Sequence, residues 1–591
     1  MQLLVIASIT HAFFLPFPRR TLPTPQATTT PASTPTIITS EEAFGARTKR
    51  ILDGIVADAD ASGGAGSSIS FSTLQAIDRA WDAVKTGRAA REAPTFVRET
   101  DNLLPNTPQF DVVIAGGTLG IFMATALQKR GFKVCVVERG PLKGRTQEWN
   151  ISRKEMMELV EEGVLSEEDV EAAIGIDFNP IRVGFVGEND EPYTLWTKDV
   201  LHLGVYPSVL LARAQARFLA AGGVVRENTP IKGVKIASNG AAIELEGEGM
   251  EDITGRLLID CMGNQSPISR QSRAGQQPDG ICIVVGTMAS GFAPENNTYA
   301  DLLYSNTPTL DKGKSQVHWF WEAFPASSGK EDRTTYLFMY CDAKPERPSI
   351  LECFEDYWDL MPAYQNVDGG IDSLTFKRAV CNFFPTYKSS PLRTEFDRLC
   401  AIGDASGIQS PLSFGGFGSL SRHIRRLTLA FSDALLTDSL SKEELGLINA
   451  YQPSLSVTWM FQRAMSVPVG ANPRPYFINR SLINNFKSMS KLGDPVLKPF
   501  LQDVVQAGPL FQAMAGIAKE DFFNTPTVLF HVGGDAFFGW FRHFFMLCVY
   551  TVLFNTLKGT KGWEGLSPKM RYRWDRQVEN WEFGSGLDYT L

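Results

Sequence analysis

The sequence predicts an α/β fold in which a dinucleotide-binding unit carries an inserted antiparallel sheet and a helical C-terminal region. Three observations lead to this prediction. Residues 110–138 follow the order strand, glycine turn, helix, strand; residues 281–341 hold segments with alternating apolar residues; and the chain after residue 420 is mostly helical in pattern. A chain of 591 residues can form two or three domains around a large core.

The first segment, FDVVIAGGTLGIFMATALQKRGFKVCVVE, has the βαβ order of a dinucleotide site. Gly116 and Gly117 form the turn, where Gly117 lets the backbone approach a pyrophosphate, and Gly120 lets the helix pack on the strand. The helix N-terminus supplies N–H donors for phosphates. Glu138, at the end of the second strand, can accept hydrogen bonds from ribose hydroxyls.

This segment departs from the usual G-x-G-x-x-G pattern at its first position, which is Ala115. An alanine is tolerable there if its φ is negative. The alternative is an ordinary βαβ unit that binds no ligand.

Several helices and strands follow in order. Acid-rich helices are expected over 152–175, and a helix over 203–223 that stops at Gly222-Gly223. Short strands are expected at 224, 231–236, 242–245 and 256–260. Alternating residues at 281–285, 317–324 and 335–341 predict the antiparallel substrate sheet.

A second glycine motif lies at 399–420. Leu399–Ile402 reads as a strand, Gly403-Asp404 closes it, and Gly415 and Gly416 precede a helix that begins near Ser419. Asp404 can accept a hydrogen bond from a ribityl hydroxyl, and the positive helix end can stabilise a reduced flavin anion. The alternative is a glycine-rich turn used only for packing.

The two motifs together, with Asp260-x-x-Gly263 between them, favour FAD over NAD alone, because FAD spans both. The predicted fold is therefore Rossmann-like and flavin-hydroxylase-like. The expected organisation is a targeting segment (1–40), an N-terminal extension outside the core fold (41–108), the first part of the FAD-binding domain (109–275), the substrate-binding sheet (276–398), the second part of the FAD-binding domain (399–450) and a helical, membrane-associating region (451–591).

The amino-acid composition argues against some classes of function. A net charge of −8 argues against a general nucleic-acid binder. The eight cysteines are scattered without a C-x-x-C pair, so we expect them to be reduced and structural, and we expect no metal site.

The N-terminus has the character of a targeting segment. Residues 3–17 are apolar but too short for a good membrane span, and a Thr/Pro/Ser-rich, acid-free tract follows Arg19 and Arg20 up to Glu41. An apolar signal followed by a hydroxylated, acid-poor segment suggests two successive targeting signals, which predicts a bipartite plastid presequence. A plain secretory signal is the alternative.

Glu322, in the aromatic segment HWFWEAFP (318–325), is the candidate catalytic acid. If this segment is a strand, Glu322 shares a face with Phe320 and His318, and His318 lies about 13 Å away at ~3.3 Å per residue. A carboxyl among aromatic rings is poorly solvated, which raises its pKa and leaves a proton to donate. The local pattern alone favours the alternative, a strand-end glutamate that faces water or pairs with Arg333.

Residues 536–554, AFFGWFRHFFMLCVYTVLF, are long enough to span a bilayer, but Arg542 and His543 near the middle argue against a span. An in-plane or re-entrant helix would suit a protein that draws an apolar substrate from lipid. A buried core helix is equally compatible with the pattern.

Six strings resemble the CruP-type lycopene cyclase paralogues, within the FAD-dependent lycopene cyclase family of plants, algae and cyanobacteria. They are GGTLGIF (116–122), QEWNISRKEM (147–156), FWEAFP (320–325), GDASGIQSPLSFGGFGSL (403–420), FQRAMS (461–466) and LGDPVLKPFLQD (492–503). The similarity extends from about Phe110 to Tyr589.

The resemblance implies a plastid, thylakoid-associated enzyme that acts on an apolar carotenoid with reduced FAD. In such cyclases a glutamate of an aromatic-rich motif protonates a ψ end group, which then cyclises without net oxidation. Glu322 is the similar position here, and Ala323 stands where the motif has a second glutamate. These paralogues are also associated with limiting carotenoid epoxides.

Two alternatives remain open at this stage. One is a different flavin reaction, by a monooxygenase or a reductase of isoprenoid chains. The other is a carotenoid-binding thylakoid factor without catalysis, which the replacement of the second acid by Ala323 keeps open.

Overall fold

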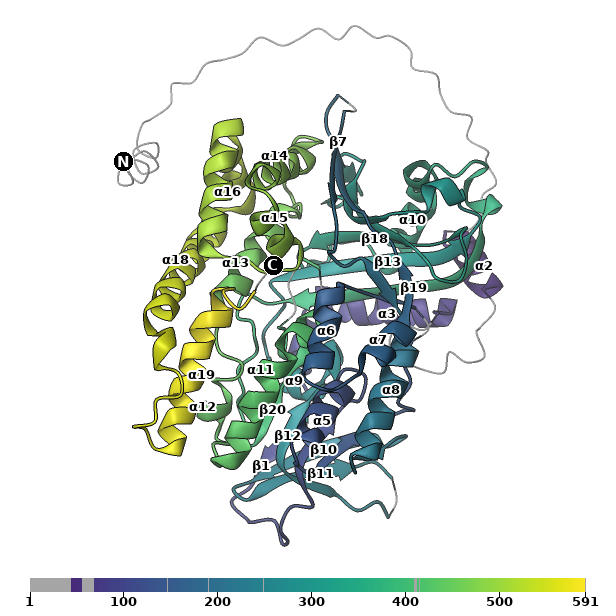
Figure 1. Ribbon diagram of the computed structural model, residues 1–591. Helices are drawn as coiled ribbons and strands as arrows, with labels where there is room; N and C mark the ends of the chain where they lie inside the picture. The colour runs from purple at the N-terminus through teal and green to yellow at the C-terminus, as the bar shows by residue number, and fades with distance from the viewer. Residues whose placement is uncertain are drawn as a thin grey trace, which may run out of the picture. The chain divides into compact units, whose positions relative to one another are not determined.

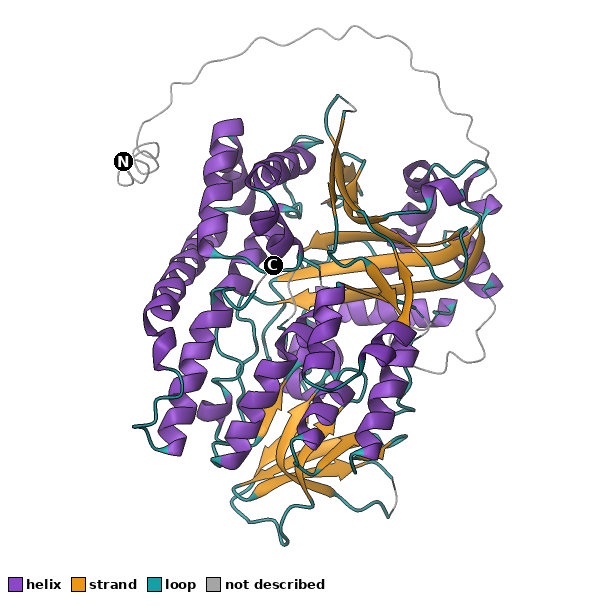
Figure 2. Ribbon diagram, viewed as in Figure 1, coloured by secondary structure: helices purple, strands orange, loops and turns teal. Residues whose placement is uncertain are grey.

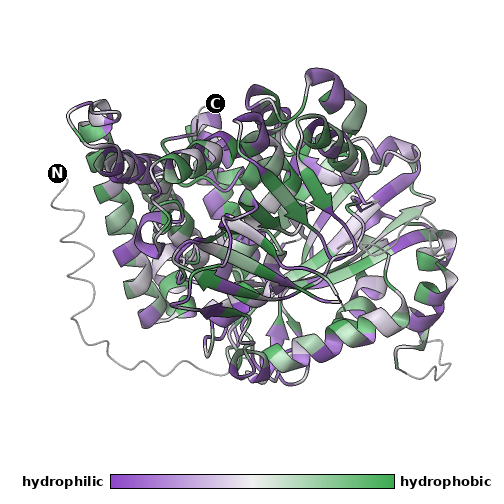
Figure 3. Cartoon of the chain, turned by 90° about the horizontal axis from the view of Figure 1, so that it is seen from below, coloured by the Kyte–Doolittle hydropathy of each residue, from purple (hydrophilic) through white to green (hydrophobic). Residues whose placement is uncertain are grey.

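The computed structural model describes residues 44–55, 68–145, 147–189, 191–247, 249–408, 412–413 and 415–589. The predicted targeting segment, residues 1–40, lies outside these described residues. Figures 1 and 2 show two sheets and a separate group of C-terminal helices, drawn in green to yellow in Figure 1. Hydrophobic residues are concentrated along several of the central strands (Figure 3).

The first sheet carries both glycine motifs. β2 (Phe110–Ala115) lies between β3 (Val134–Val137) and β12 (Ile253–Asp260), and β20 (Leu399–Ala401) also pairs with β12. All of these pairings are parallel, so the carboxyl ends of the strands meet at one edge. The continuous apolar run of β2 arises because both faces of this strand are buried. The other strands of this sheet are β1 (Val97–Glu99), β9 (Val224–Arg226), β10 (Ile231–Ala237) and β11 (Gly240–Leu245).

Helices cover this sheet, and most follow the expected segments. The expected acid-rich helices are α6 (Arg153–Glu161) and α7 (Glu167–Ala173), and each begins with a Ser capping box. The helix expected over 203–223 is shorter, because its first residues form β8 (Leu203–Val205) before α8 (Pro207–Ala220). The remaining helices of this part are α5 (Gly120–Lys129), α9 (Pro267–Ser272), α11 (Gly416–Leu436) and α12 (Lys442–Leu445).

The second sheet is the expected substrate sheet, antiparallel except for one parallel pair of strands, and its strands come from a longer part of the chain than the sequence indicated. β13 (Gly280–Ser290), β18 (Asp332–Cys341) and β17 (Phe320–Pro325) are its centre. It also includes strands from outside 276–398, because residues of the 109–275 segment form the last two strands on one side of it. The other strands are β6 (Ile181–Val186), β7 (Pro192–Thr197), β14 (Ala300–Ser305) and β19 (Thr375–Thr386). Two small sheets stand apart, one of β4 (Trp149–Ile151), β8 and β5 (Ile174–Asp177), the other of β15 (Leu310–Asp311) and β16 (Gln316–Val317).

The N-terminal segment is part of the core, which corrects the expectation that residues 41–108 lie outside it. α3 (Phe71–Lys85) matches the expected helix, but its Leu74 and Trp81 are fully buried. The Trp81 indole packs 5.6 Å from the Phe383 ring and donates a hydrogen bond of 2.9 Å to the Pro348 carbonyl. This segment therefore closes one face of the second sheet together with α10 (Ile350–Gln365), α2 (Ala46–Gly54) and α4 (Arg88–Arg91).

The region after residue 451 is helical throughout its described residues, as predicted. A long helix, α18, carries the apolar stretch near the C-terminus, and α19 returns beside it (Figure 1). The helices are α13 (Pro453–Ala464), α14 (Phe477–Leu492), α15 (Asp494–Leu501), α16 (Ala507–Glu520), α17 (Asn524–Val532), α18 (Gly534–Leu557) and α19 (Pro568–Gly584).

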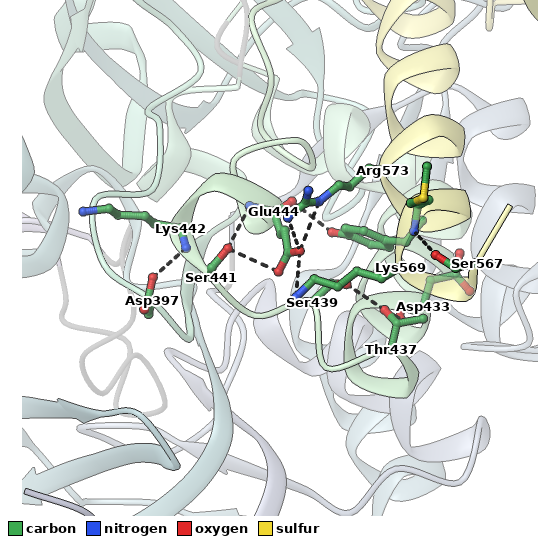
Figure 4. Close-up of polar contacts among 12 residues, drawn as sticks. Asp397, Asp433, Thr437, Ser439, Ser441, Lys442, Glu444, Ser567, Lys569 and Arg573 are labelled. Atoms are coloured by element: carbon green, nitrogen blue, oxygen red, sulfur yellow. Dashed lines mark hydrogen bonds and ion pairs between the residues drawn. The ribbon is translucent and has the colours of Figure 1, made fainter.

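A buried carboxylate ties α19 to the nucleotide-binding part (Figure 4). Glu444 of α12 lies 2.8 Å from Arg573 Nη2 and 3.1 Å from Lys569 Nζ, and the Tyr572 hydroxyl donates to the Glu444 carbonyl. Burial alone would raise the pKa of Glu444, but the hydrogen bonds from Lys569 and Arg573 outweigh it and lower the pKa. This cluster is structural, because its cations and its carboxylate satisfy one another.

Candidate functional site

The first glycine turn lies at the carboxyl end of β2. Gly116 has a φ of +94°, and a Cβ at this position would come within 2.5 Å of the Cys261 carbonyl oxygen. Only glycine fits this turn. Ala115 is the last residue of β2 and has no positive φ, so the alanine in the first motif position is harmless.

The next residues of the motif form a tight, donor-rich turn. The Gly117 N–H donates a hydrogen bond of 2.7 Å to Glu138 Oε2, so the expected ribose acceptor faces the turn. Gly120 is the first residue of α5, and a Cβ there would lie 2.7 Å from the Ile114 side chain. The turn, the helix start and the acid are therefore next to one another, as a dinucleotide requires.

The second motif places a carboxylate beneath a helix N-terminus. Asp404 follows β20, and a Cβ on Gly416 would lie only 2.2 Å from Asp404 Oδ1. Gly415 is the N-cap residue of α11, which begins at Gly416 and not near Ser419 as predicted. Gly403 has a φ of +58° and lies beside Leu119 at the start of α5. The two glycine motifs are therefore neighbours in space.

Asp404 is the strongest sign of a ligand at this edge. Its Oδ1 is buried and has no hydrogen-bond partner among the described residues. Burial raises the pKa of Asp404 to about 6. A buried carboxylate oxygen without a donor is costly unless a ligand hydroxyl or water satisfies it.

There is room for a ligand beside this carboxylate. A cavity of about 310 Å³ is lined by Asp404, Ala405 and Gly407 from one loop and by Asn264 and Gln265 from another, while much of its remaining wall comes from α3, α4 and residues 383–390, and Gly116, Gly117 and Glu138 do not line it. Gly263, which precedes them, has a φ of +75°, and a Cβ on it would meet no other described side chain or backbone atom within 4 Å. Asp260, in contrast, is used internally, because it accepts hydrogen bonds from the Ser266 hydroxyl and the Met262 N–H.

Glu322 lies in the middle of the second sheet, on β17. Its cross-strand partner is Tyr336 of β18. The side chain keeps some accessible surface, whereas its chain neighbours Trp321 and Ala323 are fully buried. Burial raises the pKa of Glu322 to about 7, and a hydrogen bond from Asn150 opposes this shift. A fraction of Glu322 side chains therefore keeps the proton at neutral pH.

Aromatic rings surround this carboxyl on its face of the sheet. Phe320 stacks 5.6 Å from Phe338 and lies 5.8 Å from Tyr340, and Phe324 packs edge-on 5.8 Å from Tyr336. Such rings offer π-faces that attract positive charge. The surroundings of Glu322 thus combine an acid with groups that stabilise a cation.

The alternative pairing of Glu322 with Arg333 is wrong in this structure, although Glu322 does keep some accessible surface. Arg333 donates to Asn297 and lies 3.7 Å from Asp301, so it is committed elsewhere. β17 begins at Phe320, so His318 lies just outside the strand, but its ring packs 4.8 Å from the Phe320 ring, in agreement with the expected shared face. His318 Nε2 lies within hydrogen-bond distance of Ser305 and Asn479, and burial lowers its pKa to about 4.

β4 connects Glu322 to the second glycine motif. Asn150 donates to Glu322, while the neighbouring Trp149 packs 4.7 Å from Phe417 in the first turn of α11. A small cavity of about 40 Å³ is lined by Asn150 together with Gly415 and Gly418. The acid and the positive end of α11 are therefore separated by one short strand.

Sequence reasoning missed the polar side chains of this short segment. Gln147 and Glu148 are buried, the former 3.0 Å from Thr334 and the latter 2.6 Å from the Ser327 hydroxyl. Arg145 is also enclosed, and burial lowers its pKa. The only signal was the similarity string QEWNISRKEM, since a three-residue strand leaves no periodicity to read.

Known structures with a similar architecture are flavoproteins. Halogenase PltM in complex with ethyl mercury and mercury is 14% identical, with a TM-score of 0.50 over 80% of this chain and 96% of that chain. PltM in complex with phloroglucinol and FAD is 14% identical, with a TM-score of 0.49 over 80% of this chain and 97% of that chain. A geranylgeranyl bacteriochlorophyll reductase-like protein from Thermoplasma acidophilum is 14% identical, with a TM-score of 0.48 over 73% of this chain and 98% of that chain.

At this level of sequence identity, the similarity to these structures is evidence for the fold alone. The predicted class, an α/β fold with a Rossmann-like FAD-binding domain of the flavin-hydroxylase type, is confirmed. No protein-family model matches the sequence, and no curated protein matches it.

Proposed function

We propose that this chain is an FAD-dependent enzyme of plastid carotenoid metabolism that cyclises a carotenoid end group by acid catalysis without net oxidation. The observation that carries this proposal is Glu322, a carboxyl among aromatic rings whose pKa is raised to about 7, so that part of it keeps a proton at neutral pH. The contact of Trp149 with Phe417 of α11, next to Asn150, supports a position of this acid near the proposed flavin site. Family resemblance supplies the substrate class.

The residues at the sheet edge fit FAD. The turn at Gly116 and Gly117 together with the α5 N-terminus would hold the pyrophosphate, and the unpartnered Asp404 Oδ1 would accept a ribityl hydroxyl. The α11 N-terminus would face the flavin ring. Bound FAD, in its reduced anionic form, would supply negative charge that stabilises a carbocation.

In the proposed reaction Glu322 donates its proton to a terminal alkene of the substrate. Asn150 holds the carboxyl in place, and the rings of Phe320, Phe324 and Tyr336 present π-faces to the cation. A neighbouring double bond of the substrate attacks the cation, and the new ring then loses a proton to the Glu322 carboxylate, which restores the acid. Protons balance and no electrons are consumed, so the reaction needs no electron donor for turnover.

Direct assay tests this proposal. FAD-loaded protein with the flavin kept reduced, incubated with lycopene in liposomes, is expected to yield a product with a cyclised end group on chromatography. NADPH consumption in fixed ratio to an oxygenated or reduced product would instead establish the monooxygenase or isoprenoid reductase alternative. Lycopene recovered unchanged from a stable complex would establish a carotenoid-binding factor.

We also propose that the protein lies on a membrane surface, the thylakoid in a plastid. Residues 534–560 are apolar enough for a span by length and composition, yet only 11% of the most apolar window is buried. This low burial argues against the alternative of a buried core helix. One face of α18 packs through Trp540 and Leu547, while Phe538, Phe541 and Phe545 are 74%, 54% and 59% exposed. A helix with one packed and one exposed apolar face suits binding in the plane of the interface.

Replacing the exposed phenylalanines tests the membrane proposal. The triple variant Phe538→Ser, Phe541→Ser and Phe545→Ser is expected to weaken liposome binding by at least tenfold, since each buried Phe contributes about 1.5–3 kcal/mol. Cosedimentation with anionic liposomes measures the effect. Leu219→Ser, which changes an exposed apolar residue of α8, is the control. Equal binding by the triple variant would exclude α18 as the membrane contact.

A further inference from the structure

An apolar cavity of about 150 Å³ lies among the C-terminal helices, away from the site described above. Its walls come from α13, α14, α15, α16, α17 and α18, which lie together in Figure 1. Four methionines line it: Met460, Met465, Met489 and Met514. No charged side chain is among its described lining residues. Methionine adapts its shape readily, so this lining suits a flexible apolar ligand.

The inner wall of this cavity continues into the surroundings of Glu322. Met465, Ile478 and Leu482 line the cavity and belong to the same buried hydrophobic cluster as Phe320 and Phe338. These two phenylalanines lie beside Glu322 on its face of the second sheet. One continuous cluster of apolar side chains therefore connects the cavity to the surroundings of the proposed acid.

The outer wall is formed by helices whose other faces expose aromatic rings. Val528 and Leu529 of α17 line the cavity, while the adjacent Phe530 is 93% exposed. On α18, Phe537 and Trp540 line it, and Phe538 and Phe541 face outward. The cavity thus lies between the face that we propose to meet lipid and the aromatic row at Glu322.

We infer that this cavity is a binding subsite for a linear isoprenoid hydrocarbon chain, which occupies it while an end group lies near Glu322. The inference rests on the proposed function, because a proton donor at the inner end needs an alkene, and a saturated acyl chain offers none. The cavity is too small for a long polyene as a whole, so it holds one portion of the chain.

Photochemical labelling tests the subsite. The probe is an all-isoprenoid C20 hydrocarbon that carries a diazirine, and adducts on the full-length, FAD-loaded protein are mapped by peptide mass spectrometry. Adducts are expected on peptides that contain Met465 or Met514, and unlabelled squalene is expected to suppress them. Ala464→Phe, which fills the cavity from α13, is expected to reduce these adducts at least tenfold. Ala515→Phe makes the same change on the exposed face of α16 and is the matched control.

The possible outcomes separate the subsite from the proposed reaction. Undiminished labelling in Ala464→Phe, with an unchanged melting temperature, would overturn the subsite, as would adducts confined to the exposed phenylalanines of α18. A parallel arm uses phosphatidylcholine with a diazirine on its acyl chain; cavity labelling by this lipid and not by the isoprenoid would overturn the assignment. Isoprenoid labelling without any cyclised product would support the subsite while disproving the proposed reaction.

Discussion

Glu322→Gln is expected to reduce carotenoid cyclisation by about 10²–10⁴-fold, the usual contribution of a general acid. The amide is nearly isosteric with the carboxyl and can still interact with Asn150, so flavin binding and the melting temperature near neutral pH should be retained. Product formation by chromatography and flavin content by absorbance measure the two effects separately. Glu331→Gln, at an exposed position between β17 and β18, should be without effect.

The pH dependence of the wild-type reaction gives an independent check on Glu322. Because its pKa is raised to about 7, the protonated fraction and hence the rate should fall as pH rises through 7. The same shift makes folding less favourable as pH rises, since the carboxyl contributes stability below its unfolded pKa and loses it on passing the folded pKa. Glu322→Gln should remove this loss of stability. A rate that is flat from pH 6 to 9 would exclude Glu322 as the acid.

Asp404→Ala is expected to have opposite effects on the apoprotein and on the holoprotein. Removal of a buried carboxylate oxygen without a partner should stabilise the FAD-free protein by about 1–3 kcal/mol. Loss of the ribityl acceptor should weaken FAD binding by about 10- to 100-fold, since a hydrogen bond to a charged group contributes about 1.5–3 kcal/mol. Thermal unfolding with and without FAD, and fluorescence titration, measure both effects.

The stabilising part of this prediction should itself depend on pH. The pKa of Asp404 is raised to about 6, so its ionisation costs the folded state stability as pH rises through that value. The gain from Asp404→Ala should therefore be larger at pH 8 than at pH 5. Asp372→Ala, at an exposed position, is the control. A variant that loses stability without FAD yet binds FAD normally would show that Asp404 is a structural residue.

The nucleotide-binding part could be predicted because its signals are local. Glycines at 116, 117 and 120 closely follow the apolar residues 112–115 of β2, which are apolar because both faces of the strand are buried there. Gly403-Asp404 likewise follows β20 at once. In each case the residues that shape the turn are neighbours in the chain.

The rest of the candidate site depends on contacts between distant segments. Asn150 reaches Glu322 from a three-residue strand, and Tyr336 opposes Glu322 only because β17 and β18 pair in one register. β6 enters the second sheet beside β14 from more than a hundred residues upstream. Side-chain periodicity within one segment carries no information on such pairings.

The position of Trp81 bears on maturation of the chain. Its indole is buried against one face of the second sheet, and Glu322 lies on the opposite face. A protease that removed α3 would therefore expose the apolar side chains on the face that Trp81 covers. If a leader is removed in an organelle, the scissile bond is therefore expected to precede these packed helices, and a recombinant form trimmed to Phe110, which lacks α2, α3, α4 and β1, should be insoluble.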